Sequence, residues 1–336
     1  MKEIFGPRLK DCQYKQKDDY TEIIARVTEV YEEDLKRLEE LKNVLTKWYV
    51  FVYGDNLIVS IDAKDGRASV RYIVRKNVNL HPIVVRVLQE YLHYLKTKGD
   101  IYDYEVYKDL IEITKSYDVP VNELNLVDKY KNVQNLVEEL LDYVQYVKDH
   151  DVRVRAGILV YDIFGKYDSL DVKVDPYEIK ITTRATPYEE LDKVRVFHER
   201  MLEELARLKE NQIDEIRVVL RIPLPTKRVP MEEWLSGKEV DIDEINLRTI
   251  IEVVLGYSTK DVKLIQEEVK VILTNYRRED YSTEDDPENA LIRDLNVKIV
   301  WNRYGKDIEY KDVKDIIKQL LEWSHKNVLY ALKNTH

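Results

Sequence analysis

Apolar and polar side chains alternate in three short runs between residues 48 and 74, WYVFVYG, NLIVSID and ASVRYIV. Asp55-Asn56 and Lys64-Asp65-Gly66 separate the runs, and both have the composition of tight turns. Because successive side chains of a strand point to opposite faces, this alternation predicts an antiparallel meander with one buried face.

A second stretch, residues 152–183, predicts three further strands by the same argument. Elsewhere apolar residues recur every three or four positions, which predicts helices. Two single strands are predicted between these helices, near residues 216–222 and 295–301. The predicted helices span residues 21–48, 82–99, 103–117, 132–149, 187–210, 243–255, 260–275 and 312–333.

These elements predict an α+β fold with two helix–antiparallel meander–helix units, at about 21–97 and 132–210, in which long amphipathic helices pack on small sheets. A mostly helical C-terminal part follows. The predicted organisation is a flexible arm over 1–18, a first domain over 19–118 and a second over 119–336, with a hinge at Val119-Pro120.

The composition of the chain limits the functions that it can have. Its 336 residues carry a formal net charge of −10, which argues against a protein that coats DNA with its whole surface. The density of charged residues and the scarcity of cysteine are typical of hyperthermophilic proteins. The single cysteine also excludes an intramolecular disulfide. No signal peptide or membrane span is evident, so we expect a cytoplasmic protein, or one within a particle assembled in the cytoplasm.

Several enzyme classes are excluded by the spacing of glycine and histidine. No two of the nine glycines lie within five residues of each other, so phosphate-binding glycine loops are absent. The six histidines contain no close pair, and His198 is interpreted as a partly buried or surface residue. An acidic loop at 279–288 lacks the ligand pattern of a calcium loop and is predicted to be solvated.

Asp162, Asp171 and Lys173 form the one pattern with catalytic character. Two carboxylates followed by a lysine on a hairpin resemble the centre of PD-(D/E)xK nucleases, and the resemblance implies a divalent metal held by Asp162 and Asp171 with Lys173 beside the attacking water. Asp168 with Glu178 and Lys180 offers a second register of the same pattern. The alternative is an exposed polar strand face.

The third strand of the first meander predicts a basic face. Val70, Tyr72 and Val74 should point into the core, while the arginines between them point outward. Such a face could bind phosphates, or its charges could pair with Asp and Glu of neighbouring strands. The candidate nucleic-acid-binding residues are Arg67, Arg71, Arg75 and Lys76.

The stripe on the predicted 21–48 helix has two interpretations, packing on the chain's own sheet or a coiled-coil contact with another subunit. Under the second, the interface residues are Tyr31, Leu35, Leu38 and Leu45.

From these patterns we interpret the chain as a non-enzymatic macromolecule-binding or assembly protein, such as an archaeal virus or mobile element could encode. We expect a protein partner, most simply a homo-oligomer, no resident cofactor and no membrane contact. A metal-dependent nuclease and a non-catalytic nucleic-acid binder remain the alternatives.

Overall fold

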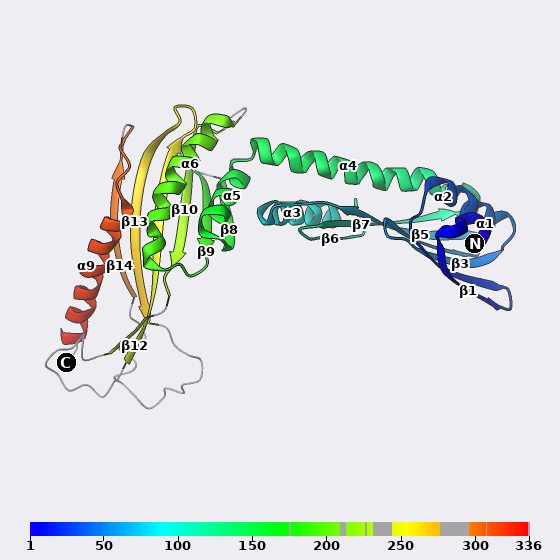
Figure 1. Ribbon diagram of the computed structural model, residues 1–336, viewed down its shortest axis with the longest axis horizontal. Helices are drawn as coiled ribbons and strands as arrows, with labels where there is room; N and C mark the ends of the chain where they lie inside the picture. The colour runs from blue at the N-terminus through cyan, green and yellow to red at the C-terminus, as the bar shows by residue number, and fades with distance from the viewer. Residues whose placement is uncertain are drawn as a thin grey trace. The chain divides into compact units, whose positions relative to one another are not determined.

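The computed structural model describes residues 1–174, 176–208, 213–225, 227–230, 244–275, 296–306 and 308–334. Two compact units, Met1–Lys148 and Asp149–His336, divide the chain (Figure 1). Each unit contains one seven-stranded sheet together with helices, so the predicted α+β class is confirmed. No helix within these ranges is long and apolar enough to cross a membrane.

The first unit has the sheet order β1-β2-β3-β4-β5-β7-β6. Only β2 and β3 are parallel, and α2 connects them. Its elements are α1 (Lys2–Phe5), η1 (Gly6–Arg8), β1 (Leu9–Lys17), β2 (Tyr20–Val27), α2 (Glu32–Glu39), η2 (Glu40–Asn43), β3 (Lys47–Tyr53), β4 (Leu57–Lys64), β5 (Arg67–Asn77), α3 (Pro82–Lys98), β6 (Asp103–Val106), β7 (Leu110–Pro120), η3 (Val121–Glu123) and α4 (Leu126–His150).

The core of the first unit lies between one face of this sheet and the helices. Tyr72 of β5 is fully buried; its hydroxyl donates to the carbonyl of Leu126 at 2.8 Å, and its ring stacks on Tyr130 of α4 at 6.2 Å. Leu35 and Leu38 of α2 are fully buried as well. The helices α2 and α4 therefore cover the same face of the sheet.

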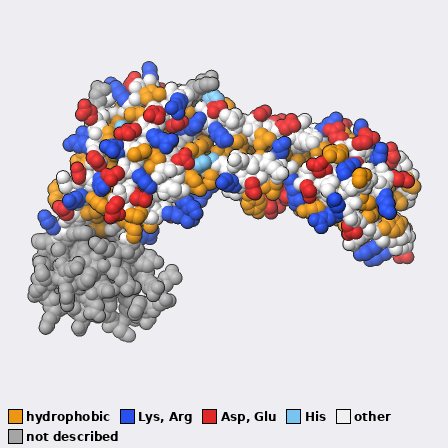
Figure 2. Space-filling view, viewed as in Figure 1, with side chains coloured by type: hydrophobic (Ala, Val, Ile, Leu, Met, Phe, Trp, Pro, Cys, Tyr) orange, Lys and Arg blue, Asp and Glu red, His pale blue; other side chains and the backbone are white. Residues whose placement is uncertain are grey.

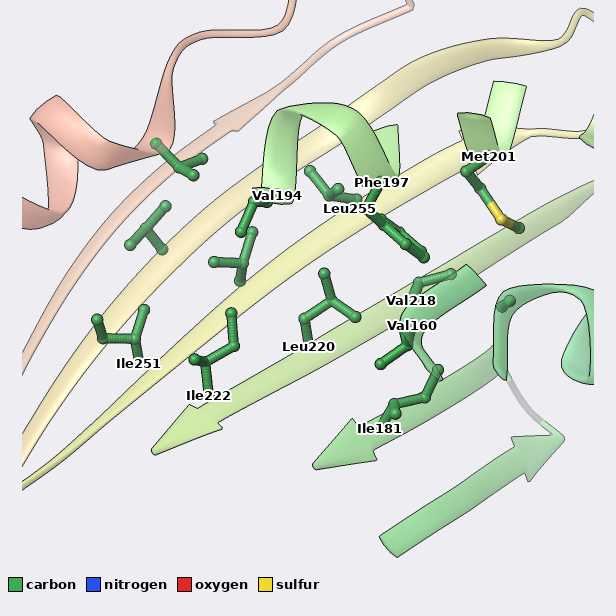
Figure 3. Close-up of a cluster of buried hydrophobic side chains, with 14 of the residues drawn as sticks. Val160, Ile181, Val194, Phe197, Met201, Val218, Leu220, Ile222, Ile251 and Leu255 are labelled. Atoms are coloured by element: carbon green, nitrogen blue, oxygen red, sulfur yellow. The ribbon is translucent and has the colours of Figure 1, made fainter. Parts of the chain in front are cut away.

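The second unit has the sheet order β14-β13-β12-β10-β9-β8, with β11 paired to β12. Its elements are α5 (Val152–Phe164), β8 (Tyr167–Val174), β9 (Tyr177–Thr183), η4 (Tyr188–Asp192), α6 (Lys193–Arg207), β10 (Glu215–Pro223), β11 (Lys227–Pro230), β12 (Glu244–Ser258), β13 (Lys263–Asn275), β14 (Asn296–Tyr304) and α9 (Val313–Asn334). Figure 3 shows Phe197 of α6 over Leu255 and Leu220 of the sheet, all fully buried.

The two units share one topology. In each, a helix precedes an antiparallel hairpin, a helical crossover leads to a parallel neighbour, and three further antiparallel strands of a common order precede a final helix; α3 and β6 in the first unit and β11 in the second are additional to this common order. Thus β1-β2-β3-β4-β5-β7 corresponds to β8-β9-β10-β12-β13-β14, with the parallel pair at the same place in both. The repetition predicted from the sequence, at 21–97 and 132–210, differs from this one in its boundaries and in its helices and strands.

Several predicted elements are confirmed. The first meander is β3, β4 and β5, each antiparallel to the next. The helix opened by Pro82 is α3, which ends at Gly99 in the left-handed conformation, φ 83°. The strands predicted near 216–222 and 295–301 are β10 and β14, and the helices predicted at 132–149, 187–210 and 312–333 are α4, η4 with α6, and α9.

The helix predicted over residues 21–48 is wrong. Thr21, Ile23, Ala25 and Val27 are buried alternately with more exposed neighbours, which is the pattern of strand β2, and only Glu32–Glu39 form the α-helix α2. The β-branched residues in TEIIARV favour a strand, and this outweighs the three-to-four spacing of the stripe.

The first of the three strands predicted over 152–183 is wrong, because Val152–Phe164 form helix α5. Asp151 caps this helix by accepting from the Arg153 amide at 2.8 Å, and Gly165, at φ 87°, ends it. An N-cap residue and a C-terminal glycine one helix length apart therefore indicate a helix here, and these two signals outweigh the alternation in VRVR.

The helices predicted at 103–117, 243–255 and 260–275 are also wrong: the first is β6 and β7, and the described parts of the others are β12 and β13. Residues 253–258 are buried on both strand faces, and periodicity cannot separate such an apolar run from a buried helix.

Two predicted boundaries fall within regular structure. Residues 1–18, expected as an arm, include α1 and strand β1, which pairs with β2. Val119 and Pro120, expected at a hinge, are the last residues of β7. The acidic loop at 279–288 lies outside the described residues.

Candidate functional site

The sheet of the first unit has a second face that the helices do not cover, here called the open face. Its side chains alternate with the buried ones and remain partly or fully exposed along β2, β3 and most of β5. The open face includes Tyr20, Glu22, Ile24 and Arg26 of β2, Tyr49, Phe51 and Tyr53 of β3, Ser60 and Asp62 of β4, and Arg67, Arg71, Ile73 and Arg75 of β5.

Aromatic side chains run along the middle of the open face. Tyr49, Phe51 and Tyr53 follow one another on β3, and Ile24 lies beside Phe51 in the strand register. Burial raises the pKa of Tyr49, and the nearby carboxylates of Asp62 and Glu22 raise it further. These rings are thus partly desolvated yet still accessible, a state common to interface aromatics.

Two of the predicted phosphate-binding arginines already have acidic partners on β7. Arg67 lies 3.1 Å from the Asp118 carboxylate, and Arg75 lies 2.7 Å from that of Glu112. Lys76 has the opposite strand parity and belongs to the helix-covered side of β5. The four residues therefore do not form one continuous cationic strip.

Arg71 is the exception among these arginines. Its Nε donates to the Ser116 hydroxyl at 3.3 Å, and its guanidinium lies 4.4 Å from the centre of the Tyr102 ring. Among the described residues, no carboxylate forms an ion pair with Arg71, and no Lys, Arg or His side chain forms one with Asp62. On the neighbouring strands β4 and β5, Asp62 and Arg71 therefore carry unpaired charges of opposite sign on the open face, and Lys64 of β4 and Arg26 of β2 add cations to it that are unpaired within the described part of the chain.

The three residues of the nuclease pattern do not lie on one hairpin. Asp162 is exposed on helix α5, whereas Asp171 and Lys173 are on β8. Lys173 pairs with Glu178 at 3.3 Å, and Asp171 stands opposite Lys180 in the register. The resemblance required Asp162 and Asp171 on two strands of one hairpin, and Asp162 lies on a helix instead.

The second register of that pattern is likewise taken up by cross-strand ion pairs. Asp168 pairs with Arg184 at 3.3 Å, and Lys180 pairs with Glu252 at 3.5 Å. Across the described parts of the chain, no three His, Cys, Asp or Glu side chains are grouped to hold a metal ion.

The predicted coiled-coil residues lie in different environments. Leu35 and Leu38 are fully buried in the first unit's own core, and Leu45 is partly buried after η2. Tyr31 is 49 % exposed, precedes α2 as its N-cap and lies 4.5 Å from the Arg8 guanidinium. This placement agrees with packing on the chain's own sheet.

A buried polar cluster in the second unit contains His198. Its Nδ1 lies 3.3 Å from the Tyr257 hydroxyl, and its ring stacks on Tyr310 at 4.5 Å. Burial lowers the pKa of His198 and raises that of Tyr257. All three rings are largely removed from solvent, so this cluster is suited to fixing the fold rather than to meeting a substrate.

Sequence reasoning did not group the aromatic side chains of the open face into one site. The run WYVFVY already places Tyr49, Phe51 and Tyr53 on one strand face by parity. Ile24 was not found, because residues 21–48 were interpreted as a helix, and Tyr20, just before that segment, was not assigned to any element. No known protein family, curated protein or solved structure matches this chain.

Proposed function

We propose that this protein is a non-catalytic assembly protein that self-associates through the open face of its first unit. The observation that supports the proposal is the partly exposed aromatic run Tyr49, Phe51 and Tyr53 on a sheet face that no described helix covers. Apolar surface on one side of a sheet is stabilised when a second layer removes it from water.

The size of the open face fits a partner of protein dimensions. Seven strands spaced about 4.8 Å apart and about seven residues long give roughly 29 Å by 23 Å, or about 670 Å² in projection. Stable protein interfaces bury about 800 Å² on each partner, so the face has nearly enough area by itself.

The charges of the open face favour a second copy of this chain over a nucleic acid. Arg67 and Arg75 are already neutralised by β7 carboxylates, and basic and acidic side chains are interspersed on the surface seen in Figure 2. The uncompensated Asp62 and Arg71 are of opposite sign. A two-fold axis parallel to the strands, between β4 and β5, would set β4 of one copy over β5 of the other.

Sedimentation velocity of the full chain over a concentration series tests the proposal. We expect a dimer of about twice the 40.1 kDa chain mass, and a monomer for Phe51→Glu, which introduces a charge into the apolar centre. Val174→Glu is the matched control, because Val174 is 83 % exposed on β8 of the other unit. A wild-type chain that stays monomeric at high micromolar concentration would refute self-association.

A further inference from the structure

A hollow of about 350 Å³ lies on the helix-covered side of the first unit, between the end of β5 and the middle of α4. Val74, Val137 and Leu141 supply its apolar lining, and Lys76 and Glu138 supply a charge from each side. Val74 and Lys76 have the opposite strand parity to Arg71 of the open face, and only Arg75, near the end of β5, belongs to the open face and also borders the hollow. Its volume lies at the lower end of the range for small-molecule sites.

The parts that line this hollow are held in place by the core. The Asn56 side chain is bound twice to the Val30 backbone, accepting from its amide and donating to its carbonyl, both at 3.0 Å. On α4, Gln134 donates to the Tyr130 hydroxyl at 2.7 Å. Tyr130 itself stacks on the buried Tyr72. The hollow is therefore formed before any ligand enters it, which reduces the entropic cost of binding.

Three charged residues line the hollow; Arg75 is paired with Glu112, whereas the other two are uncompensated. Lys76 comes from β5 and Glu138 from α4, and neither forms an ion pair within the described residues. An ammonium group binds a carboxylate and a carboxylate binds an ammonium group, so a ligand that satisfies both must carry both charges. The apolar side chains between them suit a short aliphatic group.

We propose that this hollow binds a small zwitterion with an aliphatic side chain, of the class of a free aliphatic α-amino acid. Lys76 binds the carboxylate, Glu138 binds the ammonium group, and Val74, Val137 and Leu141 contact the side chain. Gln134, whose amide oxygen has no partner within the described residues, can accept a further hydrogen bond from the ammonium group. The proposal does not depend on self-association of the chain.

Isothermal titration calorimetry of the full chain with L-leucine tests this site. We expect a dissociation constant of about 1 mM or tighter, and at least a tenfold loss in both Lys76→Met and Glu138→Gln. Glu139→Gln and Lys108→Met are matched controls, because both residues are exposed, belong to the same unit and do not line the hollow. Their affinity for leucine should equal that of the wild type.

Two analogues separate the contributions of the charges. 4-Methylpentanoate lacks the ammonium group and isoamylamine lacks the carboxylate, so each should bind at least tenfold more weakly than leucine. Equal binding of 4-methylpentanoate would show an anion site at Lys76 and overturn the proposal. An absence of heat with millimolar leucine, or unchanged affinity in both charge variants, would overturn it as well.

Discussion

The Arg303 guanidinium of β14 lies 2.6 Å from the carboxylate of Glu267 on β13, a glutamate with no exposed surface. Oε1 of the same carboxylate accepts from the Lys311 amide at 3.2 Å, just before α9. Burial raises the pKa of Glu267, while Arg303 and the Lys311 amide oppose that rise. One buried charge thus joins two strands to the segment that leads into the last helix.

Arg303→Met should destabilise the second unit by about 3 to 5 kcal/mol, because it leaves the buried Glu267 carboxylate unpaired. Arg207→Met is the control, since Arg207 is 70 % exposed in its pair with Glu204 and should cost no more than about 1 kcal/mol. Urea unfolding gives the free energies, and hydrogen exchange of β13 peptides assigns the transition to the second unit. Equal losses in the two variants would contradict this role.

His198 should make the protein less stable in mild acid. Burial lowers its folded pKa below the ordinary 6.5, so the unfolded chain takes up the proton first as the pH falls. The contribution of neutral, buried His198 to the free energy of unfolding is complete above pH 6.5, and it is lost as the pH falls from 6.5 to the lower folded pKa. Melting temperatures from pH 7.5 to 5 should fall less in His198→Asn than in the wild type, and the exposed His93→Asn should follow the wild type. Parallel curves for all three proteins would exclude the effect.

Charge exchange on the open face tests how two copies meet. Asp62→Arg and Arg71→Asp should each weaken the dimer at least tenfold, because each sets like charges against each other across the two-fold axis. The double variant should regain most of the affinity, since it restores opposite charges. Sedimentation velocity reports all four proteins. A double variant weaker than either single one would place these residues away from each other in the dimer.

Tyr72→Phe should destabilise the first unit by about 1 kcal/mol, because it removes the hydroxyl that donates to the Leu126 carbonyl at the start of α4. Amide exchange should rise in the first turn of α4 more than elsewhere. Tyr20→Phe, on the open face, is the control and should leave both measurements unchanged. A uniform rise in exchange over the whole unit would argue against a local anchor.

The sequence was sufficient where a local signal had only one structural solution. The turns at Asp55-Asn56 and Lys64-Asp65-Gly66 determined the β3-β4-β5 meander, and Pro82 and Gly99 determined the ends of α3. Parity alone separated the buried Tyr72 from the exposed Arg71. Turn residues, caps and alternation act over a few residues, so they can be recognised without the tertiary structure.

The candidate sites depended on information that is not local. Asp162 was placed on a strand because VRVR alternates, but the Asp151 cap and Gly165 make that segment a helix. Pairing of the β5 arginines with acidic residues of neighbouring strands was one of the two predictions, but the partners of Arg67 and Arg75 lie on β7, most of which was predicted as a helix, so their identity could not be foreseen. Lys76 and Glu138, which line one hollow, are far apart in the sequence.

By itself the sequence determined an α+β protein, the first meander, the ends of α3 and the basic outer face of β5. Only the tertiary structure decided that residues 1–150 and 152–334 repeat one order of helices and strands, which of its charges are paired, and which sheet face is open. The physical reason is that hydrogen-bonded strand neighbours and ion pairs are chosen by packing between segments distant in the chain, whereas alternation and caps are properties of each segment alone.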